Sequence, residues 1–222
     1  MDFIRKIYSY SKNNYHQSNS AVSSENFYKK MSTRRSIRSF SSEMIEKDIL
    51  INAIKTAASA PSGANRQPWY FALITSQNIK NKIKNAAEAV EHDFYTNKAP
   101  KSWLEDLKQF GTNSSKPYLS EAPALIAIFS RSIYFSENNE PMKTYYPIES
   151  TGIATGFLLT ALHNAGLATL THTPKPMLFL NQLLNLDNTY KPFMIVVTGY
   201  PKKPISLPVI SRKNIDQIMQ EF

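Results

Sequence analysis

Arginine and serine residues cluster near position 35, where residues 33–39 read TRRSIRS. Guanidinium groups bind phosphate and other anions through paired hydrogen bonds, and neighbouring serine hydroxyls add further donors. The cluster therefore predicts an anion site formed by Arg34, Arg35, Ser36 and Arg38. The residue types alone leave an equal alternative, which is a solvated basic stretch at the start of a helix.

Two further polar segments lie next to predicted elements of regular structure. In residues 61–69, PSGANRQPW, Ser62 offers a hydroxyl, and Gly63 lets the backbone approach a ligand closely. Residues 170–176, LTHTPKP, follow a predicted strand and bring hydroxyls and an imidazole to a strand end, where ligands gather in α/β proteins. Taken singly, a tight turn and a polar strand end are the simpler interpretations.

A carboxylate and a phenol lie four residues apart in EHDFY, residues 91–95, at the end of a predicted helix. On a helix, Glu91 and Tyr95 share one face. They lead into residues 93–118, a polar segment with isolated aromatic and leucine residues that also contains Lys116. Taken alone, these features favour a surface helix pair and a solvated loop lysine.

Several kinds of chemistry are excluded. The chain has no cysteine, which rules out disulfides, thiolate metal sites and a cysteine nucleophile. It has no G-x-S-x-G nucleophile elbow, no G-x-G-x-x-G loop and no Walker loop. His92, His163 and His172 are not spaced as metal ligands, so no metal site is predicted.

The elements that must position these residues alternate along the chain. Short apolar runs typical of buried strands occupy 69–75, 123–130, 167–171 and 192–200. Helices are expected over about 45–57, 77–92, 145–165 and 176–185. Ser41 or Ser42 is the expected cap of the first helix, and Gly166 the residue after the third. This order predicts an α+β fold, a sheet sandwiched between helical layers.

The length of 222 residues suits one domain with a sizeable core. Residues 1–26 are expected to form an N-terminal helix or arm and a serine-rich linker, and 27–222 the single domain. The net charge is +9, but the lysines are scattered, which favours a solubilising surface over a nucleic-acid partner. No apolar run reaches the ~20 residues of a membrane span, so a soluble cytoplasmic protein is expected.

In their order and spacing, RRSIR, APSGANRQPW and NAGLATLTHTP resemble the recurring blocks of the nitroreductase superfamily of flavin enzymes. The resemblance covers residues 33–213. It implies a nitroreductase-like three-layer α/β/α sandwich and an intertwined homodimer with two FMN sites at the subunit interface. It also implies flavin-binding roles for Arg34, Arg35, Ser36, Arg38, Pro61, Ser62, Gly63, Thr171, His172, Thr173 and Arg212.

Within this superfamily the chain resembles the iodotyrosine deiodinase branch, whose lid grips the zwitterion of an amino acid. Glu91, Tyr95 and Lys116 match that lid, here about 91–118, and Trp103 is in register between them. Glu91 can accept from an ammonium, while Lys116 and the Tyr95 hydroxyl can donate to a carboxylate. The resemblance implies reductive dehalogenation of 3-halotyrosines, with electrons from NAD(P)H through a reductase or from another reductant.

The same resemblance implies two contacts at the reacting centre. Thr173 is expected to hydrogen-bond flavin N5, and the backbone N–H of Ala64 to stabilise the substrate phenolate as an oxyanion donor would. The chain departs from the branch at His172, which stands in the middle of its threonine-rich edge. If His172 faced the flavin, the expected role of Thr173 would weaken.

Three other functions remain open at this point. A broad NAD(P)H-dependent nitroreductase or enone reductase would use the same flavin frame. A flavin-cleaving relative, of the kind that makes the lower ligand of cobalamin, would consume its own FMN. A non-catalytic flavin- or tyrosine-binding protein would bind halotyrosine without turnover.

Overall fold

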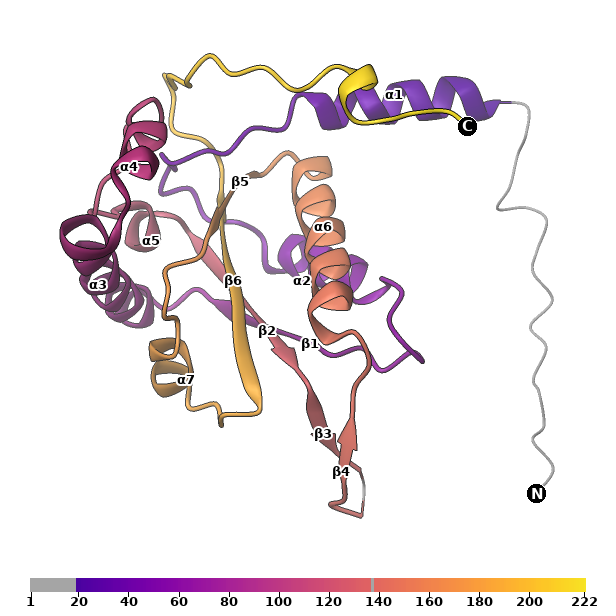
Figure 1. Ribbon diagram of the computed structural model, residues 1–222, viewed down its shortest axis with the longest axis vertical. Helices are drawn as coiled ribbons and strands as arrows, with labels where there is room; N and C mark the ends of the chain where they lie inside the picture. Colours follow the sequence, from indigo (N-terminus) through magenta and orange to yellow (C-terminus); the bar gives the residue numbers. More distant parts are fainter. Residues whose placement is uncertain (1–18, 137) are drawn as a thin grey trace. The chain divides into compact units, whose positions relative to one another are not determined.

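The computed structural model describes residues 19–136 and 138–222 (Figure 1). It forms two compact units, of which one ends at Arg34 and the other spans Arg35–Phe222. The first unit contains helix α1 (Ser20–Ser32). Residues 20–26, expected as linker, are therefore helical. On this helix Lys29 pairs with Glu25, one turn earlier, at 2.6 Å. The expected helix before residue 13 lies outside the described residues.

The larger unit is built on a four-stranded sheet in the order β1-β2-β6-β5, in which every neighbouring pair is antiparallel. The strands are β1 (Trp69–Ile74), β2 (Ala124–Arg131), β5 (Ala168–His172) and β6 (Tyr190–Gly199). All four predicted strands are present. Helices separate several of these strands in sequence. The strands are nevertheless antiparallel, so each one runs in the direction opposite to its neighbours in the sheet.

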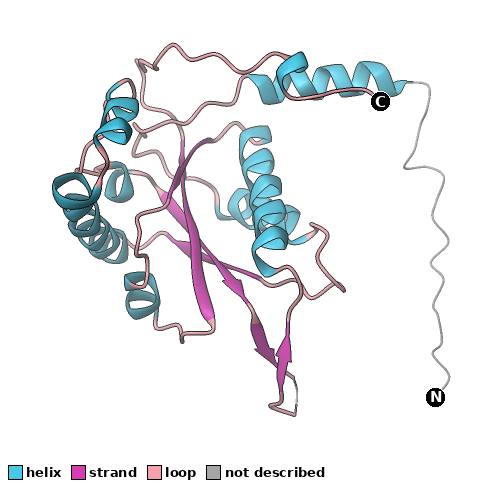
Figure 2. Ribbon diagram, viewed as in Figure 1, coloured by secondary structure: helices cyan, strands magenta, loops and turns pink. Residues whose placement is uncertain are grey.

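Helices cover both faces of this sheet, which confirms the predicted three layers (Figure 2). One face carries α3 (Gln77–Asp93), α5 (Tyr118–Glu121) and α7 (Phe179–Leu184), and the other carries α2 (Lys47–Ala58) and α6 (Pro147–Asn164). Strand β2 shows why its sequence is a continuous apolar run. Leu125 and Phe129 pack with the first helical layer, whereas Ile126 and Ile128 pack with the second.

One local prediction was wrong, and one element was missed. Helix α2 begins at Lys47 after Glu46 and has no side-chain cap. Ser41 is not its cap, because the Ser41 N–H donates to the Tyr200 carbonyl at 2.9 Å and so fastens this segment beside the end of β6. The short hairpin β3 (Ile133–Phe135) and β4 (Pro141–Lys143) was not predicted, since three residues per strand give too little alternation to detect.

Other boundaries agree with the sequence. Gly166 has a φ of 81°, as expected for a residue that follows the end of α6. The C-terminal tail is extended except for the short 3-10 helix η4 (Ile215–Gln217). Prolines in this segment remove the donors that a longer helix would need.

Candidate active site

A cavity of about 480 Å3 lies between the end of β5 and residues 90–116. Its polar lining comprises Arg38, Glu91, Tyr95, Thr112, Lys116, Tyr118, Thr171, His172, Thr173 and Lys175. Its apolar lining comprises Val90, Phe94, Trp103, Leu107, Leu170 and Pro174. The volume and the mixture of aromatic, apolar and a few charged groups are those of a small-molecule site.

The segment that roofs the cavity is more helical than its sequence suggested. After α3 the chain forms the π-helix η3 (Phe94–Lys98) and the helix α4 (Lys101–Lys108). Pro100, at the N-cap of α4, separates the two helices. The rings of Phe94 and Trp103 meet edge to face with centroids 5.1 Å apart, so the two helices pack together through residues that also line the cavity.

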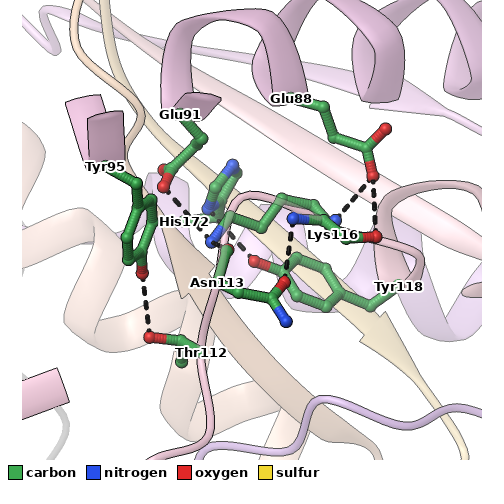
Figure 3. A network of polar contacts seen from close by, with 9 residues as sticks. Glu88, Glu91, Tyr95, Thr112, Asn113, Lys116, Tyr118 and His172 are labelled. Atoms are coloured by element: carbon green, nitrogen blue, oxygen red, sulfur yellow. Dashed lines mark hydrogen bonds and ion pairs between the residues drawn. The ribbon is translucent and has the colours of Figure 1, made fainter. Parts of the chain in front are cut away.

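Glu91 and Lys116 form an ion pair inside the cavity (Figure 3). Lys116 Nζ lies 3.2 Å from Glu91 Oε2, and the two side chains are only 5 % and 15 % exposed. The ammonium also donates to the Asn113 carbonyl and lies 5.2 Å from the centroid of the Tyr95 ring. A pair of charges with so little access to water must be compensated locally. The structure thus brings together the three predicted lid residues.

Tyr95 presents its hydroxyl to the same space. It lies 3.0 Å from Thr112 Oγ1, and Thr112 also lines the cavity (Figure 3). Because Tyr95 follows Glu91 by four residues, the end of α3 and the first turn of η3 carry both groups to one side. This arrangement offers a carboxylate, an ammonium and a phenol within one cavity.

Sequence reasoning missed a second carboxylate that acts on Lys116. The backbone N–H of Lys116 donates to Glu88 Oε1 at 2.6 Å, and the Ser115 hydroxyl lies 3.3 Å from the same oxygen. Glu88 precedes Glu91 by three residues on α3, so both carboxylates share a helix face. That spacing was the available signal, but the partner lies 28 residues away in sequence.

At the end of β5, alternate side chains point in opposite directions. Thr171 and Thr173 are exposed, whereas His172 between them is buried. The His172 and Tyr118 rings meet edge to face with centroids 5.7 Å apart, and the Tyr118 hydroxyl lies 3.4 Å from His172 Nδ1 (Figure 3). The strand therefore turns the imidazole away from the side on which the two threonines lie.

Burial dominates the electrostatics of this aromatic pair. Burial, followed by the positive charge of Lys116, lowers the pKa of His172 to about 3. Burial, followed by the negative charge of Glu91, raises the pKa of Tyr118. Both rings are therefore neutral near pH 7, beside a cavity wall that carries full charges.

The arginine cluster runs beside β5 in the larger unit. Ile37 N–H donates to the Thr169 carbonyl at 3.0 Å, and Ser36 is bridged to Thr169. Arg38 lines the cavity, and Arg35 Nη2 donates to the Pro208 carbonyl at 2.5 Å. Arg34 is the last residue of the smaller unit, and its backbone N–H donates to the Met31 carbonyl at 3.1 Å.

The loop at 61–67 lies outside the cavity lining. Ala64, Asn65 and Gln67 have left-handed φ values of 49°, 53° and 47°, a strained backbone for residues with side chains. A Cβ at Gly63 would lie 2.9 Å from the Tyr145 carbonyl oxygen, so the loop needs glycine to approach Tyr145. Among the described residues, the lining of the cavity lacks Arg34, Arg35, Ser36, Pro61, Ser62, Gly63, Ala64 and Arg212.

Comparison with known proteins relates this cavity to a large enzyme family. Residues 31–200 match the Nitroreductase family. The chain belongs to the nitroreductase family. All three sequence blocks that carried the resemblance lie inside the matched range, whereas Arg212 lies beyond it.

Individual relatives within the nitroreductase family are similar over most of the chain. An iodotyrosine deiodinase of Haliscomenobacter hydrossis is 42 % identical over 88 % of this chain and 88 % of its own. Iodotyrosine deiodinase 1 of Homo sapiens is 38 % identical over 95 % of this chain and 73 % of its own. A crystal structure of oxidized iodotyrosine deiodinase bound to FMN and 3-iodo-L-tyrosine superposes with a TM-score of 0.71. The match covers 85 % of this chain and 98 % of the chain in that structure, and the two sequences are 31 % identical.

Two other kinds of feature are absent from the part of the chain that the structure describes. Across 19–136 and 138–222, no three histidine, aspartate or glutamate side chains gather as metal ligands. Within the same residues, no helix has the length and apolar character needed to cross a membrane.

Proposed function

We propose that this nitroreductase-family protein is an FMN-dependent reductive dehalogenase of 3-halotyrosines. The observation that carries the proposal is the Glu91–Lys116 pair, 3.2 Å apart and nearly closed to water in the cavity. An amino-acid zwitterion offers one ammonium and one carboxylate, which match these two groups in charge and number. The iodotyrosine deiodinase relatives, similar over most of the chain, support the same substrate class.

The residues present fit a flavin. Arg38, Thr171 and Thr173 contribute a guanidinium and two hydroxyls to the lining of the cavity, and flavin carbonyls and ring nitrogens accept such donors. Arg35 and Ser36 adjoin them and are proposed to hold the phosphate with Arg38. The turn of β5 that buries His172 leaves Thr173 on the exposed side, which suits its proposed contact to flavin N5.

Substrate binding exchanges partners within the lid. Glu91 releases the Lys116 ammonium and accepts hydrogen bonds from the substrate ammonium, while Lys116 and Tyr95 donate to the substrate carboxylate. Each charge that leaves one partner gains another, so no buried charge is left uncompensated. A ligand that carries only one of the two charges leaves either Glu91 or Lys116 without a partner and binds more weakly.

FMN bound here would supply the two electrons of the reaction, which together with one proton taken up from water convert the carbon–halogen bond into a carbon–hydrogen bond and release halide and tyrosine. The backbone N–H of Ala64 is proposed to donate to the substrate phenolate. The lid helices η3 and α4 exclude water through their apolar residues Phe94, Trp103 and Leu107. NAD(P)H, through a reductase, or another reductant is the proposed electron source.

A homodimer is part of the proposal. Ile153 and Phe157, one turn apart on α6, are 44 % and 39 % exposed, so this outer helix presents two neighbouring apolar side chains that a second copy would cover. Residues 61–64 are expected beside the flavin, but they do not line the cavity of a single described chain. A second copy is therefore proposed to complete that side of the cavity. The mass of the FMN-loaded protein in solution, measured by light scattering, tests this assembly.

The decisive experiment is turnover of 3-iodotyrosine by the dithionite-reduced, FMN-loaded protein. We expect stoichiometric release of iodide and tyrosine, and quenching of flavin fluorescence when iodotyrosine binds the oxidised protein. Absence of both would overturn the proposal. Rapid NAD(P)H oxidation with nitroaromatic compounds, unaffected by Glu91→Ala or Lys116→Ala, would instead identify a broad nitroreductase.

A further inference from the structure

Two carboxylates on one face of α3 hold opposite ends of a single lysine. Glu91 contacts the Lys116 ammonium at 3.2 Å, while Glu88 Oε1 accepts the Lys116 backbone N–H at 2.6 Å (Figure 3). Ser115 adds a hydroxyl contact to the same Glu88 oxygen at 3.3 Å. A hydrogen bond from a backbone N–H to a carboxylate is charge-assisted and about twice as strong as a neutral one.

The turn that carries Lys116 has other bonds, which lie within the turn or join it to the start of α5. Asn113 Oδ1 accepts the Ser115 N–H at 2.9 Å, and the Asn113 carbonyl accepts from Lys116 Nζ. The Lys116 carbonyl accepts the Leu119 N–H at 3.0 Å, where α5 begins. These contacts shape the turn, whereas the Glu88 bond attaches its backbone to α3.

The distinction becomes important when substrate binds. The proposed exchange transfers Glu91 from Lys116 to the substrate ammonium, and the ion pair between the turn and α3 is then lost. The bond from Glu88 to the Lys116 backbone does not involve the ammonium and survives the exchange. It keeps the lysine in position for the substrate carboxylate, so less ordering accompanies binding.

We propose that Glu88 is a positioning residue for amino-acid recognition, which holds the 113–116 turn on α3 while Lys116 changes partners. This inference rests on the proposed dehalogenase function and deepens it. Glu88 does not line the cavity, so in this proposal it contacts neither the substrate nor the flavin. Its effect is therefore on the affinity for ligands with a carboxylate, and it leaves the chemical step unchanged.

A purely structural role would work through Lys84, which lies one helical turn before Glu88. Lys84 Nζ is 4.0 Å from Glu88 Oε1, and the two side chains are 30 % and 26 % exposed. An ion pair of this length and exposure contributes little to stability. The geometry thus favours the Lys116 backbone as the main partner, and Lys84→Ala is the matched control.

The test uses the FMN-loaded protein with two ligands, 3-iodotyrosine and 2-iodophenol, of which the second lacks the ammonium and carboxylate. We expect Glu88→Ala to weaken iodotyrosine binding about tenfold, the loss of one charge-assisted hydrogen bond. Affinity for iodophenol and the kcat at saturating iodotyrosine stay the same. Glu88→Gln keeps an acceptor and the side-chain volume, and it restores most of the affinity, while Lys84→Ala matches the parent protein.

Hydrogen exchange of the free protein provides a readout that needs no substrate. The Lys116 amide should exchange faster in Glu88→Ala than in Glu88→Gln or the parent protein, because its acceptor is lost. Unchanged exchange, unchanged iodotyrosine affinity, or an equal loss for both ligands would overturn the positioning role. If the parent protein itself neither binds nor dehalogenates iodotyrosine, the proposed function fails instead, and the exchange measurement still decides whether Glu88 anchors the turn.

Discussion

The two walls of the cavity differ in how their polar groups are neutralised. The lid wall, formed by Glu91, Tyr95 and Lys116, carries full charges that neutralise each other at 3.2 Å. The strand wall, formed by residues 171–173, carries two exposed hydroxyls and a buried imidazole that is neutral because burial lowers its pKa to about 3. One wall is thus ready to exchange ionic partners, and the other offers uncharged donors.

This difference separates recognition from chemistry. Charged groups discriminate strongly between ligands, because a missing partner leaves a charge in a place with little water. Neutral donors fixed on a strand suit a cofactor whose charge changes during reaction, because they need little rearrangement. Variants in each wall should therefore change different quantities, and the following four measurements are ordered by the size of the expected effect.

Lys116→Ala should remove the ion pair of the lid wall and cause the largest change in substrate affinity. Loss of the ammonium leaves Glu91 without its partner and the substrate carboxylate without its donor. We expect 3-iodotyrosine to bind about 100-fold more weakly, a loss of about 2.7 kcal/mol, when binding is followed by quenching of flavin fluorescence. Lys108→Ala on α4, with a side chain 72 % exposed, is the control and should bind normally. An affinity within threefold of the parent protein would refute the charge-exchange account.

His172→Gln should sharpen the contrast by replacing the titratable group of the strand wall, residues 171–173, with a side chain that is neutral at every pH. The pKa of His172 in the folded protein is about 3, below the ordinary histidine value of 6.5, so the unfolded chain binds the proton more readily. The stability contributed by the neutral imidazole is fully present above pH 6.5 and declines as the pH falls towards 3. Between pH 7 and pH 5 this amounts to a loss of about 2 kcal/mol in the free energy of unfolding.

Urea unfolding of the two proteins at pH 7 and pH 5 isolates this contribution. The fall in stability between the two pH values should be smaller in His172→Gln than in the parent protein, and His92→Gln, at an exposed histidine, should behave as the parent does. An identical pH dependence in His172→Gln and the parent would show that His172 is not protected from protonation.

The sequence predicted the parts of this molecule whose causes are local. Helix α3 was expected over 77–92 and spans Gln77–Asp93, and β2 was recognised from its apolar run because both of its faces are covered. Glu88 was missed because a glutamate four residues after a lysine resembles an ordinary surface pair, and only the tertiary fold brings it to the Lys116 backbone. The orientation of His172 became clear only from the strand register, since a shift by one residue would exchange it with its threonine neighbours.

Thr173→Val tests the strand wall as a contributor to chemistry. Removing its hydroxyl deletes the proposed donor to flavin N5, and we expect the turnover of iodotyrosine to fall about tenfold with little change in its affinity. Thr173→Ser retains the hydroxyl and should recover most of the rate. A fall in affinity without a fall in turnover would assign Thr173 to substrate binding and would remove the separation between the two walls.

Thr112→Val should make the smallest change, because it acts on the lid wall through Tyr95. The Tyr95 and Thr112 hydroxyl oxygens are 3.0 Å apart, and this contact orients the phenol without carrying charge. Losing one neutral hydrogen bond corresponds to about 0.7 kcal/mol, so iodotyrosine should bind about threefold more weakly. Thr112→Ser keeps the hydroxyl and should bind as the parent protein does. A loss in Thr112→Val as large as that in Lys116→Ala would mean that orientation of the phenol, and not exchange of ionic partners, controls recognition by the lid.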